Sequence, residues 1–176
     1  TIIAAHGVIR RSASAELTAL AERGGIPVIE TFQGKGAIDN RHPMSLLTVG
    51  LPWRDRVMDV LEAADLVVAV GYDLVEYPPY RWNPDADKAI VHIGTLPAEV
   101  DDHYVPQEEI VADLGPALDA LAEAIPSRSP WDFAPLRAAI FGELEAAAED
   151  SSFPVKPQRL VADLRRALVE DAILVS

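Results

Sequence analysis

The sequence predicts an α/β fold in which helices cover both faces of a parallel sheet, followed by a helical linker. Over residues 1–125, short apolar runs typical of strands alternate with segments whose apolar residues recur at helical spacing. The run Leu66-Val-Val-Ala-Val70 is apolar throughout, as expected of a strand buried on both faces of a parallel sheet. This alternation favours right-handed crossovers between parallel strands, the arrangement of Rossmann-like folds.

The first predicted elements alternate strand and helix, with glycines at the boundary. Residues 2–5 are expected to form a strand, residues 13–23 an amphipathic helix, and residues 26–29 the start of a second strand. Gly24-Gly25 ends the helix, because glycine is favoured just beyond a helix C-terminus. A segment rich in turn residues follows over residues 33–43.

The same alternation continues up to residue 125. Residues 53–64 are expected to form a helix, and strands follow at residues 66–70, 88–93 and 109–114. A helix over residues 117–125 closes the series. The compact Rossmann-like domain is therefore expected to span residues 1–125.

Beyond residue 125 the predicted strands give way to linkers and helices. The expected elements are a linker over residues 127–130, a helix over 131–150, a linker over 151–157, a helix over 158–169 and a strand-like run over 172–176. Apolar runs at both ends of the chain, without polar tails, suggest one domain of a longer protein. We expect residues 126–176 to be linker helices and first elements that lead into a C-terminal domain.

Composition excludes several classes of function. The chain has 28 acidic and 15 basic residues and a net charge of −13, so binding to nucleic acid or to an anionic membrane surface is not expected. It has no cysteine, which rules out disulfides and thiolate metal sites. The four histidines lack metal-binding spacing, so no metal site is expected. We expect a cytoplasmic protein.

The loop after the second strand, Thr31-Phe-Gln-Gly-Lys-Gly36, is one candidate for ligand contact. Gly-x-Gly allows close approach of a ligand to the backbone, and Lys35 could meet a phosphate or a carboxylate. The alternative is a purely structural turn, because the third glycine of a dinucleotide fingerprint is missing.

The loop from Gly71 to Asn83 is the second candidate. It follows a buried strand, and the carboxyl edge of a parallel sheet is where α/β folds place ligands, so Gly71 and Tyr72 are candidate cleft residues. Tyr72, Tyr77, Tyr80 and Trp82 could also anchor an interface with a neighbouring domain. The alternative is that these rings pack onto their own domain.

Three further motifs have competing interpretations. His6-Gly7 and Gly50-Leu-Pro-Trp53 could line a vestigial nucleotide crevice, but tight turns with a packed Trp are favoured. Asp101-Asp102 beside His103 could be catalytic, but an exposed loop is favoured.

The order and spacing of several segments resemble the central domain of thiamine-diphosphate enzymes of the acetolactate synthase family, particularly the catabolic type that works without a flavin. The segments that carry the resemblance are Ala13-Ser-Ala-Glu-Leu17, Gly25-Ile-Pro-Val28, the Thr31–Gly36 loop, His42-Pro43, Ala64-Asp-Leu66, Gly71 to Asn83, Val91-His-Ile93 and Pro97-Ala-Glu-Val-Asp101. Pro157-Gln-Arg-Leu-Val161 and Asp171 to Ser176 resemble the start of the family's C-terminal domain.

The resemblance implies a three-domain enzyme whose cofactor sites lie outside this domain. Such an enzyme decarboxylates pyruvate and condenses it with a second 2-oxo acid, using thiamine diphosphate and magnesium. The chain has no Gly-Asp dipeptide, so the family's metal motif is absent, and no catalytic residue can be assigned. Gln33 and Lys35 become cleft or interface candidates, because this loop lies over the family's dinucleotide-like cleft.

The resemblance also implies that flavin is not bound. Gly50-Leu-Pro-Trp53 and Tyr72 to Glu76 depart from the flavin-binding pattern, and Gly94 stands where the family commonly has an acid. We therefore expect a structural, interdomain fragment that alone is inactive and binds no cofactor, whose partners are the other two domains, with the full-length enzyme a homo-oligomer.

Two other readings stay open. One is a self-standing nucleotide- or acyl-CoA-binding module. The other is a deacetylase-like relative. That class requires a catalytic His and usually a zinc site, and neither is evident in the sequence.

Overall fold

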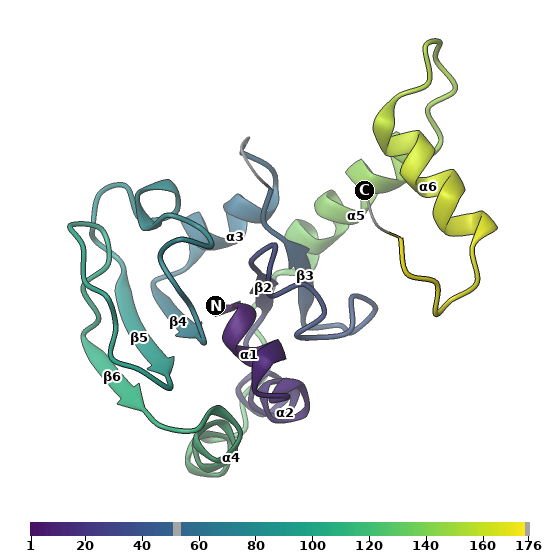
Figure 1. The fold of residues 1–176 in the computed structure, drawn as a ribbon. Coiled ribbons are helices and arrows are strands. Elements are labelled where there is room, and N and C mark those ends of the chain that lie inside the picture. The colour runs from purple at the N-terminus through teal and green to yellow at the C-terminus, as the bar shows by residue number, and fades with distance from the viewer. Residues whose placement is uncertain (51–53, 175–176) are drawn as a thin grey trace. The chain divides into compact units, whose positions relative to one another are not determined.

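The computed structural model describes residues 1–50 and 54–174, which belong to two compact units, Thr1–Leu136 and Arg137–Ser176. The first unit confirms the predicted α/β fold, because its strands form one parallel six-stranded sheet accompanied by helices (Figure 1).

The sheet has the strand order β3-β2-β1-β4-β5-β6, and all of its pairings are parallel. The strands are β1 (Ile2–Ala4), β2 (Val28–Glu30), β3 (Ser45–Thr48), β4 (Leu66–Val70), β5 (Ala89–Gly94) and β6 (Glu108–Val111). The chain runs outward from β1 to β3 and then returns to the other side of β1 with β4. In open α/β sheets, ligand crevices form outside the carboxyl ends of the strands at such a switch point.

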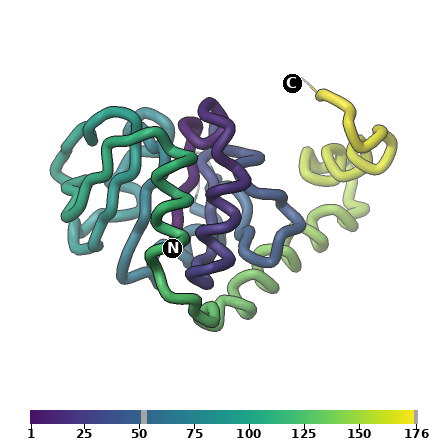
Figure 2. Tube along the Cα trace, turned by 90° about the horizontal axis from the view of Figure 1, so that it is seen from below, coloured from purple at the N-terminus to yellow at the C-terminus, as the bar shows by residue number. Residues whose placement is uncertain are grey.

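The described helices are α1 (His6–Arg10), α2 (Ser14–Gly24), α3 (Val57–Ala63), α4 (Leu114–Ala124), α5 (Ala134–Ala148) and α6 (Pro157–Ala167), and a 3-10 turn, η1, spans Pro79–Arg81. Helices α2 and α4 lie side by side on one face (Figure 2), where Ile2, Val70 and Ile93 join their buried leucines. Because successive side chains of a strand alternate, Ile3 and Ile90 point to the opposite face.

Two elements were missed from the sequence. Strand β3 was not predicted, because Ser45 interrupts its apolar pattern. The strand is also irregular: its pairing with β2 shifts register near Leu47, whose φ is 65°. Helix α1 begins at His6, where a tight turn was expected. A helix of five residues is too short to show a helical period.

The predicted elements between residues 1 and 169 are present with shifted ends. Helix α3 begins at Val57. Of the proposed Gly50–Trp53 turn, residues 51–53 lie outside the described residues. Strand β6 starts and ends earlier than expected, because α4 already begins at Leu114. Residues 172–174, expected to start a strand, have no regular structure, and the last two residues lie outside the description.

The second unit contains most of α5, all of α6 and the segments next to them. Ion pairs stabilise the connection between these two helices. Lys156 pairs with Asp150 at 2.6 Å, and Arg166 pairs with Glu149 at 2.5 Å. The Lys156 ammonium holds the pKa of the Asp150 carboxyl well below its usual range. The apolar residues of α6 remain largely exposed; Leu160 and Val161 are 54% and 60% accessible.

Candidate functional site

A cavity of about 470 Å³ opens at the carboxyl edge of the sheet. It is lined by residues that follow three strand ends: His6 and Gly7 after β1, the Gly71–Glu76 segment after β4, and Gly94 to Pro97 after β5. These strand ends flank the switch point between β1 and β4, so the cavity lies where α/β sheets bind ligands.

Backbone contact between two glycines closes the floor of this cavity. The Gly7 amide donates to the Gly71 carbonyl at 3.0 Å, and Gly71 has a φ of 60°. A Cβ on Gly7 would lie 2.5 Å from the Gly71 Cα, and a Cβ on Gly71 would lie 2.6 Å from the Gly7 Cα. Only glycine at both positions allows β1 and β4 to end this close together.

The buried carboxylate of Glu76 ties together the ends of three strands. Glu76 is 5% exposed; its oxygens accept the His6 amide at 3.1 and 3.3 Å and the Thr31 hydroxyl at 2.6 Å. His6 follows β1, Thr31 follows β2 and Glu76 follows β4. A carboxylate of the chain itself therefore lies at the amino-terminal end of α1, where Rossmann folds place a dinucleotide's pyrophosphate.

A second buried carboxylate, Glu30, organises the loop after β2. Glu30 is fully buried, and its Oε1 accepts the amides of Gly36 and Ile38 at 2.9 and 3.1 Å. Burial raises the pKa of Glu30, and these hydrogen bonds oppose that shift. The loop then packs on the end of β1, since a Cβ on Gly34 would lie 2.4 Å from the Ala4 carbonyl oxygen.

The four predicted cleft residues divide into two pairs. Gly71 and Tyr72 line the cavity. Gln33 and Lys35 are exposed on the loop after β2, and neither is among the residues that line it.

Three of the four loop aromatics belong to the domain's own core. Trp82, Tyr77 and Tyr72 are 1%, 2% and 7% exposed, whereas Tyr80 is 52% exposed. The Trp82 indole donates to the Tyr72 hydroxyl at 3.1 Å, and Tyr72 donates to the Tyr77 carbonyl. The prediction that Trp82 anchors an interface is therefore wrong, and the alternative that it packs within its own domain is correct. The 3-10 turn at Pro79 directs Trp82 inward, so the loop covers its own sheet.

The neutral side chains of His92 and Tyr104 form the polar end of the cavity. His92 is 4% exposed; its Nε2 lies 3.4 Å from the Leu96 carbonyl and its Nδ1 lies 2.8 Å from the Tyr104 hydroxyl. A carbonyl can only accept, so Nε2 carries the proton and Tyr104 donates to Nδ1. Burial lowers the pKa of His92 and raises the pKa of Tyr104. Neither residue was identified from the sequence as part of a site.

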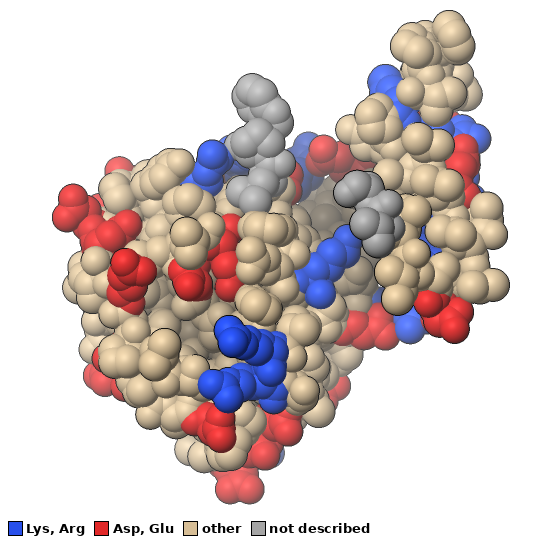
Figure 3. All heavy atoms as spheres, in the orientation of Figure 1, with Lys and Arg blue, Asp and Glu red and all other residues tan. Residues whose placement is uncertain are grey.

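The rim of the cavity carries positive charge from α1. Arg10, the last residue of α1, and Arg11, its C-cap, both line the cavity and are exposed. Figure 3 shows Lys and Arg side chains gathered over α1, on a face where acidic groups are otherwise scattered.

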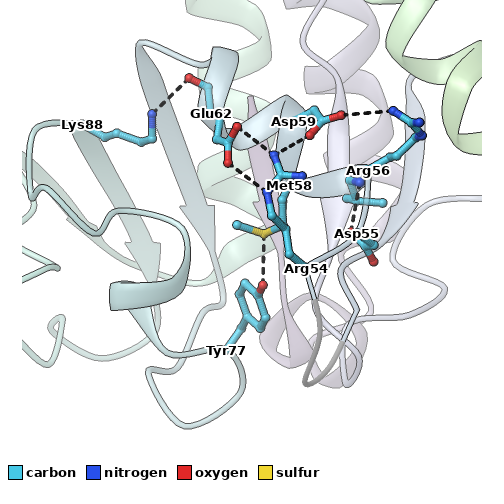
Figure 4. A network of polar contacts seen from close by, with 9 residues as sticks. Arg54, Asp55, Arg56, Met58, Asp59, Glu62, Tyr77 and Lys88 are labelled. Carbon is cyan, nitrogen blue, oxygen red and sulfur yellow. Dashed lines mark hydrogen bonds and ion pairs between the residues drawn. The ribbon is translucent and has the colours of Figure 1, made fainter.

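A separate charged network lies on α3, outside the cavity lining (Figure 4). Arg54 pairs with Asp59 at 2.6 Å and with Glu62 at 2.8 Å. Below it, the Tyr77 hydroxyl contacts the Met58 sulfur at 3.0 Å, which anchors the aromatic loop to α3.

The Asp101–His103 segment was expected to be an exposed loop; it is a turn in which Asp101 and His103 are half-buried. Asp101 accepts the His103 amide at 2.7 Å, and Asp102 is exposed. Within residues 1–50 and 54–174, no group of three or more His, Cys, Asp or Glu side chains could hold a metal ion. No helix in this part of the chain is long and apolar enough to cross a membrane.

Fold and site together define a Rossmann-like domain in which the buried Glu76 carboxylate lies at the amino-terminal end of α1. Residues 1–121 match the family model of the thiamine pyrophosphate enzyme central domain, and the chain belongs to that family. The resemblance to the acetolactate synthase family is thereby confirmed.

Individual relatives agree with this assignment. The chain is 28% identical to an acetolactate synthase of Bacillus subtilis over 86% of its length, and 32% identical to a probable acetolactate synthase large subunit of Methanocaldococcus jannaschii over 96%. A catabolic acetolactate synthase of Raoultella terrigena is 42% identical over 39% of the chain and 12% of that relative. The chain spans only 27% and 29% of the first two relatives.

Proposed function

We propose that this chain is the central domain of a thiamine-diphosphate-dependent carboligase of the acetolactate synthase type. The full-length enzyme would decarboxylate pyruvate and condense it with a second 2-oxo acid. The observation that carries the proposal is the family match over residues 1–121, together with relatives that extend far beyond this chain. Glyoxylate carboligase of Escherichia coli O157:H7, 29% identical over 99% of the chain, supports the broader carboligase class.

Within that enzyme the domain contributes structure and interdomain contacts. Thiamine diphosphate supplies the carbanion chemistry when it is bound. The described residues do not fit that cofactor or its magnesium, because no suitable cluster of acidic ligands is present among residues 1–50 and 54–174 and the sequence has no Gly-Asp dipeptide. The side chains at the switch point instead bind one another and hold the strand ends in place.

We also propose that the domain carries no flavin, as in the catabolic type. The Glu76 carboxyl group occupies the amino-terminal end of α1 and accepts the His6 amide, so a phosphate there would meet a filled volume and an acceptor instead of a free donor. At the end of β5, a Cβ on Gly94 would lie 2.5 Å from His92 Nε2, so an acidic residue at this position would displace His92. Both features oppose binding of a dinucleotide.

Residues 126–176 are proposed to lead into a C-terminal cofactor-binding domain, with residues 1–125 as the central domain. The exposed Leu160 and Val161 on α6 support this, since an amphipathic helix normally buries its apolar face. The other domains of the same polypeptide are the proposed partners, and the enzyme is proposed to be a cytoplasmic homo-oligomer, a location consistent with the absence of cysteine.

The proposal for this chain is tested by calorimetric titration with thiamine diphosphate and magnesium, and separately with FAD. The chain alone should give no saturable heat with either cofactor and should form no acetolactate from pyruvate. Saturable heat at micromolar thiamine diphosphate would contradict the structural role, and retention of FAD after dialysis would contradict the flavin-free proposal.

A further inference from the structure

The cavity at the switch point has an electrostatic asymmetry that the proposed function does not use. Arg10 and Arg11 lie on one side of its lining. Among residues 1–50 and 54–174, neither guanidinium has a hydrogen-bond or ion-pair partner, although the chain has 28 acidic residues. Guanidinium groups of two successive residues that both line a cavity are suited to bind a planar oxyanion.

The remaining lining limits the ligand to a small anion. Glu76 is already engaged with the His6 amide and Thr31, so the end of α1 offers no second anion position. Asp73 and Glu99 line the cavity from the loops after β4 and β5, and their charges oppose a polyanion such as a nucleotide. A single carboxylate near the arginines avoids that repulsion.

An apolar surface lies beside the arginines within the same cavity. Leu74, Leu96 and Leu114 are among the lining residues, but Leu114 is 1% exposed and packs in the core. Leu96 is 74% exposed, so its side chain is available to a ligand, and Leu74 and Leu96 form the leucine wall. The polar groups of His92 and Tyr104 already satisfy one another. A ligand therefore meets the guanidinium groups of Arg10 and Arg11 and the apolar surface of the leucine wall, in a cavity that Asp73 and Glu99 also line.

We propose that this cavity binds a small carboxylic acid with an apolar tail, whose carboxylate is held by Arg10 and Arg11 and whose tail contacts the leucine wall. The volume of about 470 Å³ lies within the range of pockets for small molecules. The cavity lies where a nucleotide crevice would form, but Glu76 fills the amino-terminal end of α1 and Gly94 stands where an acid would bind a ribose. It does not depend on the carboligase assignment.

The test is calorimetric titration of the chain with 4-methylpentanoate at constant ionic strength. A ligand of about eight heavy atoms should bind with a dissociation constant of roughly 0.1–1 mM. Acetate lacks the tail and 4-methylpentan-1-ol lacks the carboxylate, so each should bind at least about tenfold more weakly. ADP serves as the polyanionic nucleotide and should not bind.

Matched variants assign the interaction to the proposed residues. Arg10→Ala/Arg11→Ala should weaken 4-methylpentanoate binding by roughly tenfold or more. Lys35→Ala/Arg128→Ala makes the same change in net charge outside the cavity and should leave the affinity within about twofold of the parent. Leu96→Ser should weaken the acid but leave acetate unchanged.

Several results would overturn the proposal: no saturable heat with the acid, equal affinity for the acid and the alcohol, tighter binding of ADP, or an equal loss in both double variants. All five substituted positions are exposed, and far-UV circular dichroism of each variant checks that folding is retained. None of these outcomes bears on whether the full-length enzyme is a carboligase.

Discussion

Replacing Trp82 with alanine should lower the free energy of unfolding of the chain by about 3–5 kcal/mol, the cost of truncating a buried Trp. Trp82 is 1% exposed, and its ring packs edge-on against Tyr72 and Tyr104 with centroid distances of 6.3 and 6.1 Å. Truncation removes apolar contact area and leaves a cavity between these rings. It also removes the indole donor to Tyr72, a hydrogen bond that contributes roughly 1 kcal/mol within that total.

The assay is urea unfolding followed by far-UV circular dichroism, because Trp53 and Trp131 also fluoresce. Tyr80→Ala is the matched control: it truncates an aromatic side chain in the same loop, but one that is 52% exposed. The control should change stability by no more than about 1 kcal/mol.

A loss below about 1 kcal/mol for Trp82→Ala, or equal losses in the two variants, would refute the assignment of Trp82 to the core. It would also restore the aromatic loop as a surface available to another domain.

Three further changes test the strand-end contacts. Gly71→Ala should lower the free energy of unfolding by roughly 2 kcal/mol or more, because its Cβ would lie 2.6 Å from the Gly7 Cα at a φ of 60°. Gly142→Ala is the control: it lies in open space on α5, and the change should be neutral or stabilising. Thermal unfolding compares the two variants. Glu76→Gln should cost roughly 1–3 kcal/mol, because the amide keeps only one acceptor atom for the His6 and Thr31 donors; an unchanged melting temperature would contradict this. Because the folded-state pKa of His92 is lowered, its contribution is fully present above about pH 6.5 and is lost as pH falls through that lowered pKa. His92→Gln should therefore flatten the decline in stability between about pH 7 and 5, and an unchanged slope would contradict the linkage.

The sheet could be predicted from the sequence because its central strands are buried on both faces. Leu66 to Val70 and the run around Ile90 are almost wholly apolar, and the helices between strands carry clear periodicity. The edge strand β3 could not be predicted in the same way. Its Ser45 is buried and its Leu47 takes a positive φ, so neither composition nor period identifies a strand.

The place of the site was predictable, but most of its contacts were not. Gly71 and Tyr72 follow a buried strand, and parallel sheets bind ligands at that edge. Glu76 and His6 are 70 positions apart in the sequence, and no local sequence pattern predicts their hydrogen bond. The aromatic loop shows the same limit: aromatic residues suit an interface and a core equally well, and only the fold decides between them.

We propose that this chain is a flavin-free structural domain of a thiamine-diphosphate carboligase. The most direct measurement is acetolactate formation from pyruvate by the full-length enzyme encoded in frame with this chain, with thiamine diphosphate and magnesium each added or omitted. We expect product only when both are present, at a rate that added FAD does not change, from enzyme without the flavin absorbance near about 450 nm. Product formation by this chain alone, a requirement for FAD, or no pyruvate consumption under any condition would contradict the account.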